Sequence, residues 1–330
     1  ALVAALLALA PAARAQEVKL PAAITMTAYD TGSSGFNIAV AVGKALKDKY
    51  GADTRILPAG NDVARLGPLK GSRAQLSAMG VGGYFAQEGV FEFAAKEWGP
   101  QALRLMLSSL DCNGISLGVA KDTGVKEIKD LKGKRIGAVV GSPALNQNSL
   151  AVLAFGGITK ADVKLVEFAS YGAMWKGMLT NEIDAAVAST ISGQAKEMET
   201  SPRGLVYPLL PHADKAGWER LLKIGPYFQP HMVSCGAGFS PQNVGEIASY
   251  AYPIFMAYAD QPTALVHSIT KAMIVSYDAY KDAAPGTSGL DAKRQNLKWV
   301  MPYHEGAAQA LKEAGVWKEE NVVYNQNLLK

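Results

Sequence analysis

The sequence predicts a two-lobed α/β fold, and three observations lead to this prediction. Residues 23–81 repeat the order strand, loop, helix, and the same unit returns at 115–188. The chain has 330 residues, which is long enough for two domains of roughly 100–200 residues each. Strands that alternate with helices predict sheets covered by helices, so we expect one such sheet in each lobe.

The first unit begins at 23–28, a short strand pattern that ends in the turn-rich segment 30–35. A helical pattern follows, with its apolar residues spaced for one face. Residues 54–57 and 76–81 have strand patterns, and 58–62 begins the helix between them.

The second unit has strand patterns at 115–120, 136–140 and 163–168, a helix at 145–155, and a closing segment at 182–188. The C-terminal third has a mostly helical pattern, without a new Gly-rich loop between a strand and a helix. We therefore expect two α/β lobes of the same kind.

The N-terminus predicts a secretory signal peptide at 1–15. Residues 2–10 form an unbroken apolar run, followed by Pro11 and the small-x-small pattern at 13–15. The run is too short to cross a bilayer, which takes about 20 residues, but it suits an apolar core before a cleavage site. A buried N-terminal helix is the alternative. We expect a periplasmic mature protein whose membrane role depends on a partner.

Composition argues against several functional classes. Charged residues make up 19% of the chain and hydrophobic residues 49%, which is ordinary for a globular protein. The net charge of +4 comes from scattered Lys and Arg, so we expect no nucleic-acid partner. The four histidines and two cysteines lack metal-site spacing, and we expect no metal and no cofactor.

Two segments match sequence patterns of hydrolases. Residues 114–118 match G-x-S-x-G, but that motif needs a sharp turn, and Ser116 lies inside an apolar strand pattern. Residues 268–271 match S-x-x-K, but they lie on a helical pattern and the companion motifs are absent. We therefore do not expect an enzyme.

The candidate binding loops follow the strands. Residues 31–35 and 141–143 each end a strand and open a helix. Ligands of open α/β sheets bind at the carboxyl ends of strands, where helix N-termini offer free N–H groups and partial positive charge. Two such loops facing each other would suit a carboxylate or similar anion. For either loop alone, an ordinary N-cap turn is the alternative.

Several short motifs occur in a characteristic order. They are Thr31-Gly32-Ser33-Ser34-Gly35 and the segments at 59–62, 122–125, 130–137, 181–186, 269–272 and 302–307. With these motifs, the chain from Thr25 onward resembles the TAXI family of TRAP-transporter solute receptors, which have the type II periplasmic-binding-protein fold.

The resemblance implies a receptor that closes around one small solute and docks on an integral-membrane TRAP permease. Studied members of the family bind small organic acids, such as amino-acid or keto dicarboxylates. A binding protein for a signalling receptor, or an exported enzyme on this fold, would be the alternatives. Residues 16–115 and 235–330 should form one lobe and 116–234 the other, joined by crossover strands.

The cysteines lie near these crossovers. Cys112 precedes the strand that should leave the first lobe, and Cys235 lies near the segment that should return. Crossover strands of this fold run side by side, and export permits a disulfide. A disulfide and two free thiols both remain open.

The second-lobe loop departs from the family pattern Gly-Ser-Gly-Thr. Pro143 removes a backbone donor, and Asn146 or Gln147 is the candidate to replace the missing hydroxyl. We expect the first loop to donate to one end of the ligand, Ser142 and Asn146 to donate to the other, and an aromatic residue to cover it. The candidate ligand-binding residues are Thr31, Ser33, Ser34, Asn61, Gly80, Gly141, Ser142, Asn146, Tyr171 and Ser189.

Overall fold

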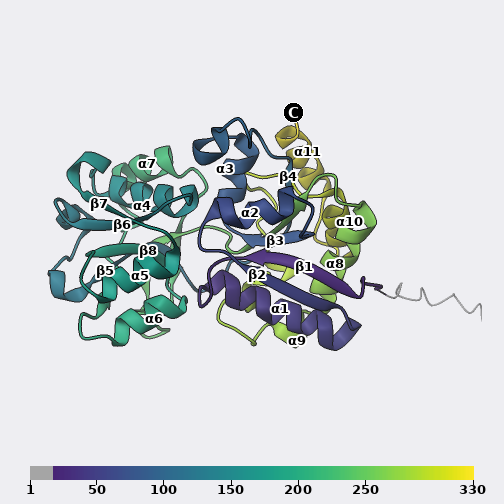
Figure 1. Ribbon diagram of the computed structural model, residues 1–330, viewed down its shortest axis with the longest axis horizontal. Helices are drawn as coiled ribbons and strands as arrows, with labels where there is room; N and C mark the ends of the chain where they lie inside the picture. Colours follow the sequence, from purple (N-terminus) through teal and green to yellow (C-terminus); the bar gives the residue numbers. More distant parts are fainter. Residues whose placement is uncertain (1–17) are drawn as a thin grey trace, which may run out of the picture.

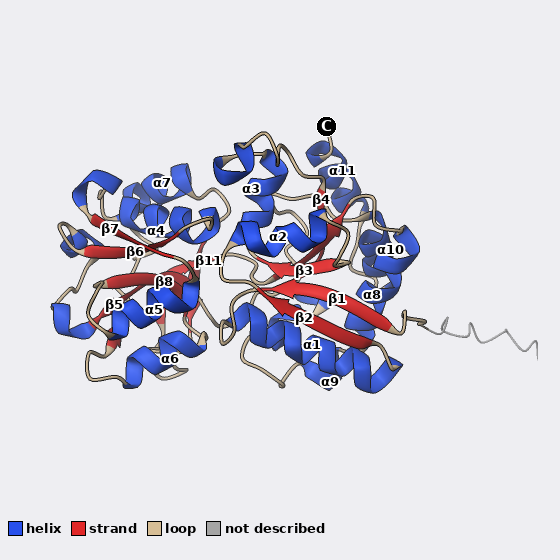
Figure 2. Ribbon diagram, in the orientation of Figure 1, coloured by secondary structure: helices blue, strands red, loops and turns tan. Residues whose placement is uncertain are grey.

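The computed structural model describes residues 18–330, which form two α/β lobes side by side (Figure 1). The signal peptide predicted at 1–15 lies outside the described residues. In each lobe, helices cover both faces of a central five-stranded sheet (Figure 2). No helix within residues 18–330 combines the length and the apolar content needed to cross a bilayer.

The first sheet has the strand order β2-β1-β3-β12-β4. β2 and β3 run parallel to β1, whereas β12 runs antiparallel to both of its neighbours, so the sheet is mixed. The strands are β1 (Ala23–Ala28), β2 (Asp53–Pro58), β3 (Leu76–Met79), β4 (Leu103–Ser108) and β12 (Ile254–Tyr258).

The helices of this lobe are α1 (Ser34–Tyr50), α2 (Asp62–Lys70), α3 (Gly82–Glu88), α8 (Thr263–Val275), α9 (Tyr277–Tyr280), α10 (Glu305–Glu313) and α11 (Glu319–Leu328). α1 shows why these segments are helical. Ser33 caps its N-terminus by accepting a hydrogen bond from the Phe36 N–H, and Gly51 ends it at φ +68°. Between these caps, apolar residues at helical spacing, such as Ile38 and Val42, are buried against the sheet.

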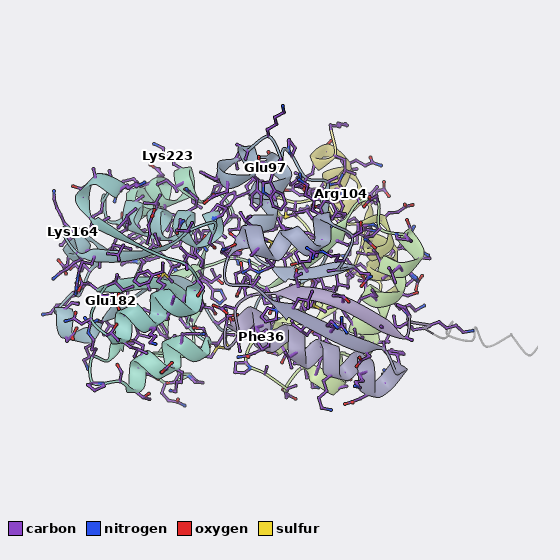
Figure 3. The ribbon with its side chains drawn as sticks, viewed as in Figure 1. Phe36, Glu97, Arg104, Lys164, Glu182 and Lys223 are labelled. Carbon is purple, nitrogen blue, oxygen red and sulfur yellow. A yellow bond between two sulfur atoms is a disulfide. The ribbon has the colours of Figure 1, made fainter. Side chains whose placement is uncertain are left out.

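The second sheet has the order β7-β6-β8-β5-β9. We call the lobe of the first sheet lobe 1 and the lobe of the second sheet lobe 2. Its strands are β5 (Ile115–Ala120), β6 (Arg135–Val139), β7 (Lys164–Phe168), β8 (Ala185–Ser189) and β9 (Leu205–Val206). The helices of this lobe are α4 (Pro143–Phe155), α5 (Tyr171–Leu179), α6 (Gly193–Thr200) and α7 (Lys215–Ile224). Charged side chains such as Lys164, Glu182 and Lys223 lie exposed on the outside of this lobe, whereas Phe36 at the start of α1 lies where the two lobes meet (Figure 3).

The chain crosses between the two sheets twice. It leaves the first sheet after β4 and returns at β12, after an antiparallel ribbon of β10 (Gln229–Val233) and β11 (Gly245–Ser249). A disulfide joins Cys112 to Cys235, with α-carbons 5.5 Å apart. The Ser234 N–H also donates to the carbonyl of Cys112 at 3.0 Å, so the two crossing segments are tied side by side.

Candidate functional site

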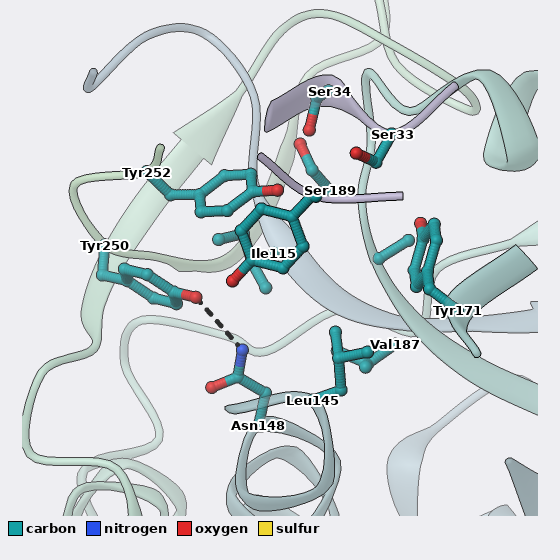
Figure 4. Close-up of a pocket in the computed structure, with 12 residues that line it drawn as sticks. Ser33, Ser34, Ile115, Leu145, Asn148, Tyr171, Val187, Ser189, Tyr250 and Tyr252 are labelled. Atoms are coloured by element: carbon teal, nitrogen blue, oxygen red, sulfur yellow. Dashed lines mark hydrogen bonds between the residues drawn. The ribbon is translucent and has the colours of Figure 1, made fainter. Parts of the chain in front are cut away.

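A small cavity of about 30 Å³ lies between the two lobes (Figure 4). It is much smaller than the ~300–1,000 Å³ of typical ligand pockets, so the two lobes are closed on each other. Both lobes and the returning crossover contribute to its wall. The lining residues are Tyr29, Ser33, Ser34, Ile115, Leu145, Asn148, Tyr171, Val187, Ala188, Ser189, Tyr250 and Tyr252.

Two adjacent serines bring the N-terminus of α1 to the cavity. Ser33 and Ser34 are 3% and 2% exposed, and they occupy the N-cap and the first position of the helix. The Ser33 hydroxyl accepts a hydrogen bond from the Phe36 N–H at 3.2 Å. The loop before α1 therefore presents hydroxyl groups and the positive end of a helix dipole to this side of the cavity.

Four tyrosines line the cavity: Tyr29, Tyr171, Tyr250 and Tyr252. Figure 4 labels the last three. The rings of Tyr29 and Tyr252 meet edge to face, with centroids 5.3 Å apart. Burial raises the pKa of Tyr252 to about 12 and raises the pKa values of the other three phenols. All four hydroxyls are therefore neutral near pH 7 and can donate hydrogen bonds.

An amide–phenol network holds one of these rings in place. Asn148 of α4 donates to the Tyr250 hydroxyl at 3.3 Å (Figure 4) and accepts from the Tyr227 hydroxyl at 2.8 Å. On the lobe 2 side, the Tyr171 hydroxyl donates to Ser192 at 3.2 Å, and Ser189 accepts from the Asn113 amide at 3.0 Å.

Charge lies behind the cavity wall. Among the described residues, none with a charged side chain lines the cavity. Arg65 and Asp62 of α2 form a buried ion pair with an N–O distance of 2.7 Å and side chains 1% and 0% exposed. The guanidinium lies 3.6 Å from the ring centroid of Tyr29, so it supports that ring from behind.

Lobe 1 oxygens meet three helix N-termini of lobe 2. Asp62 accepts from the Ala144 N–H of α4 at 2.8 Å, and Asp30 accepts from the Gly172 N–H of α5 at 3.0 Å. The Gly193 N–H of α6 donates to the carbonyl of Gly32 at 3.0 Å. These bonds hold the lobes together in the closed form.

Ser33, Ser34, Tyr171 and Ser189, four of the ten residues proposed from sequence, line the cavity. Gly80 lies just behind the wall, because a Cβ at this position would come within 2.4 Å of the Tyr29 hydroxyl. The sequence interpretation selected these residues by their position at strand ends or in loops expected to face the cleft, and as ligand-binding residues they stay a prediction.

The other five proposed residues do not line the cavity. Thr31 is exposed, and its carbonyl accepts from the Gln194 amide at 3.0 Å. The Asn61 side chain caps α2 by accepting from the Ala64 N–H at 2.8 Å. Gly141, at φ +72°, uses its carbonyl to accept from the Val63 N–H at 3.1 Å. These three residues lie in contacts between the lobes or in a helix cap.

The expectation that Ser142 and Asn146 hold the far end of the ligand does not fit their geometry. Ser142 is fully buried, and its hydroxyl has no partner among the described residues. Both groups of the Asn146 amide bond back to Val139, to its N–H at 2.9 Å and its carbonyl at 3.0 Å. The amide therefore closes the turn between β6 and α4 instead of facing the cavity.

Sequence reasoning missed Tyr29, Asn148, Tyr250 and Tyr252. Tyr29 follows β1 directly, so the strand-end rule that selected Thr31 would also have selected it. The two later tyrosines precede Pro253 in the returning crossover, where two aromatic residues so close together were a usable signal. Asn148 had no such signal, because nothing local indicates which face of α4 borders the cavity.

Comparison with known protein families assigns most of the chain to one family. Residues 26–315 match the model of the NMT1-like family. The chain belongs to the NMT1-like family.

Two solved structures show a similar fold. One is the alkanesulfonate-binding protein SsuA from Xanthomonas axonopodis pv. citri bound to MOPS, with TM-score 0.52 and 15% identity over 94% of this chain and 84% of that chain. The other is an ancestral arginine-binding protein bound to arginine, with TM-score 0.51 and 16% identity over 81% of this chain and 100% of that chain. At this identity the likeness shows the fold alone. The two-lobed periplasmic-binding-protein fold predicted from the sequence is confirmed.

Proposed function

We propose that the chain is an exported solute-binding protein that captures a small organic acid between its lobes and delivers it to a membrane permease of the TRAP type. The observation that carries this proposal is the cavity, whose wall combines residues of both lobes and the returning crossover. A site built in this way couples ligand binding to lobe closure. The ordered motifs that resemble the TAXI receptors favour a TRAP permease as the partner.

The chemistry of the wall supports a carboxylate ligand. Ser33, Ser34 and the first turn of α1 supply donors on one side of the cavity, with Tyr252 beside them. A carboxylate at this position accepts from hydroxyls and lies at the positive end of the helix. Each neutral hydrogen bond contributes about 0.5–1.5 kcal/mol net, so several are needed for useful affinity.

The position of Ser116 supports a binding protein over a hydrolase. This serine is fully buried in β5, where it pairs with Ala188 of β8. A nucleophile of the G-x-S-x-G type lies exposed on a sharp turn between a strand and a helix.

A thermal-shift screen of organic acids would test the proposal. A ligand at a hundred times its Kd adds about 2.7 kcal/mol to stability. In calorimetric titration with the best ligand, we expect the Ser33→Ala/Ser34→Ala double variant to bind roughly 10- to 100-fold more weakly, because two donors are lost.

A helix-cap variant separates lost binding from lost stability. Asp214→Ala removes the N-cap of α7, where the carboxylate accepts from the Gly217 N–H at 2.8 Å, and Asp214 does not line the cavity. It should lower stability by about 1 kcal/mol, as the loss of the Ser33 cap does, and leave affinity unchanged. Unchanged affinity in the double serine variant would show that the ligand binds elsewhere.

A further inference from the structure

Lobe 2 has three helix N-termini at the boundary between the lobes, and in the closed form lobe 1 occupies each of them. In α5, the first three N–H groups are all used: Tyr171 donates to the Gly60 carbonyl at 3.1 Å, Gly172 to Asp30, and Ala173 to its own cap, Ser170, at 3.2 Å. The first turn of α5 has no donor left for a ligand.

The N-terminus of α4 is occupied by a buried charge. Pro143 has no N–H, so Ala144 supplies the first donor of this helix, and the Asp62 carboxylate accepts from it at 2.8 Å. Asp62 is 0% exposed and is fixed from the other side by Arg65. A ligand carboxylate at this helix would have to displace Asp62 from both the Ala144 N–H and Arg65, and breaking a buried ion pair is costly.

The charges of both aspartates reach the cavity wall. Burial raises the pKa of Tyr171, and the Asp30 carboxylate adds to this increase. Burial also raises the pKa of Tyr250, and the Asp62 carboxylate is among the groups that add to it. Asp30 is therefore near the phenol that lobe 2 adds to the wall, whereas Asp62, whose charge is balanced by Arg65, is near the crossover phenol, and neither aspartate lines the cavity itself.

The two sides of the cavity differ in chemistry. Among the described residues, no lobe 2 oxygen accepts from the first turn of α1, so Ser33 and Ser34 remain directed at the cavity. Opposite them, lobe 2 contributes the apolar side chains of Leu145, Val187 and Ala188. Its polar lining side chains are already hydrogen-bonded within the protein; they are Asn148, Tyr171 and Ser189. One side suits an anionic group, and the other suits hydrocarbon.

We propose that Asp30 and Asp62 are specificity-determining residues that make this site select monocarboxylates over dicarboxylates. The inference rests on the proposed function and narrows its ligand class. One carboxylate of the ligand binds at α1, and its apolar body packs on lobe 2. A second carboxylate would meet the two aspartates that already occupy the α4 and α5 N-termini when the lobes close.

Matched pairs of acids test this proposal with the full-length mature protein. Calorimetric titration would compare propanoate with malonate, butanoate with succinate, pentanoate with glutarate, and hexanoate with adipate. Within the pair that contains the tightest ligand, we expect the monocarboxylate to bind at least about 100-fold more tightly. An equal or tighter dicarboxylate would overturn the inference and leave the proposed function standing, whereas an absence of binding or stabilisation by any organic acid would contradict the proposed function itself.

The variant Asp30→Asn tests the role of the charge. Asparagine retains an oxygen that can accept from the Gly172 N–H, so closure is preserved while the negative charge is removed. We expect the dicarboxylate of the chosen pair to gain about 10-fold in affinity and the monocarboxylate to change by less than about 3-fold. An unchanged ratio between the two acids would overturn the role of Asp30.

Two further variants complete the test. Asp122→Asn removes an equal charge from lobe 2, at a carboxylate that pairs with Arg203 and is 46% exposed. It should leave the ratio of the two acids' affinities unchanged. Asp62 is tested as Asp62→Asn/Arg65→Gln, since changing Asp62 alone would leave Arg65 buried without its partner. This double variant should also bring the affinities of the monocarboxylate and the dicarboxylate closer together. Circular dichroism checks that the variant is folded before titration.

Discussion

At the scale of single residues, most of the polar groups that line the cavity are hydroxyls. Ser33, Ser34 and Ser189 contribute three, and four buried tyrosines contribute the rest. Neutral donors of this kind avoid the large cost of burying an unpaired charge. Burial raises the pKa of Tyr252 to about 12, so this phenol remains a donor throughout the neutral range.

Asp162 gives a prediction about acid stability. The Thr159 hydroxyl and N–H, together with Lys132, lower the pKa of this carboxyl to about 2, compared with about 3.9 in an unfolded chain. Because the native pKa is the lower one, the stabilisation is fully present above about pH 4 and is lost as the pH falls toward 2. In thermal unfolding, Asp162→Asn should melt below the wild type at pH 7, and the two midpoints should converge near pH 2.

A second carboxylate serves as the control for this experiment. Glu219→Gln, at an exposed position of α7, should melt close to the wild type at pH 7. A wild-type advantage over Asp162→Asn that persists at pH 2 would contradict the assignment.

Ser33 and Ser142 have similar local sequences but different surroundings in the structure. Both follow a glycine after a strand and both open a helix, so the local sequence predicts both equally well as hydrogen-bond donors to a ligand. Only Ser33 borders the cavity, because Asp62 of the other lobe occupies the helix that Ser142 begins. The contact that causes this difference joins Asp62 to Ala144, 82 residues apart in the chain, and the local sequence contains no signal for it.

Among the elements, α2 depends most on a buried charge. Asp62 and Arg65 lie one turn apart, and the pair joins α2 both to the ring of Tyr29 and to α4 of the other lobe. Breaking a buried pair by removing one partner leaves a buried charge uncompensated, which costs about 3–5 kcal/mol. We therefore expect Asp62→Ala to lower the free energy of unfolding by about this amount in urea titration.

An exposed pair in α1 is the matched control. Lys44 and Asp48 lie on the helix surface with side chains 74% and 59% exposed. Surface pairs contribute about 0–1 kcal/mol, so Asp48→Ala should have a small effect. Equal losses in the two variants would show that the buried pair has no special role.

Elements were easier to predict than their contacts. The strands at 23–28 and 115–120 were placed correctly because short apolar runs bounded by turns are local signals. The strand expected at 76–81 ends at Met79, since the next residues turn into α3. The ion pair of α2 was not anticipated, because an Asp and an Arg one turn apart usually lie on an exposed helix face.

At the scale of the whole molecule, the disulfide closes a loop of chain that contains the whole second sheet. All five strands of the second sheet lie between Cys112 and Cys235, which are 123 residues apart. Cross-linking a loop of this length restricts the unfolded chain, and removing a native disulfide typically costs about 2–5 kcal/mol. We expect Cys112→Ser/Cys235→Ser to lose stability in this range while retaining ligand affinity.

Reduction provides the internal control. A thiol reductant should lower the unfolding midpoint of the wild type to that of the double variant and leave the double variant unchanged. A wild type that is insensitive to full reduction, as verified by thiol titration, would contradict this expectation.

The small size of the closed cavity has a consequence for the rate of capture. The closed form leaves only about 30 Å³ of free space between the lobes, so we expect a solute to enter while the lobes are apart. The observed association rate should then rise with solute concentration only until it reaches the opening rate, and level off there. Trp299, which stacks on Tyr250 with centroids 6.2 Å apart, provides a fluorescence signal for stopped-flow measurement of that plateau.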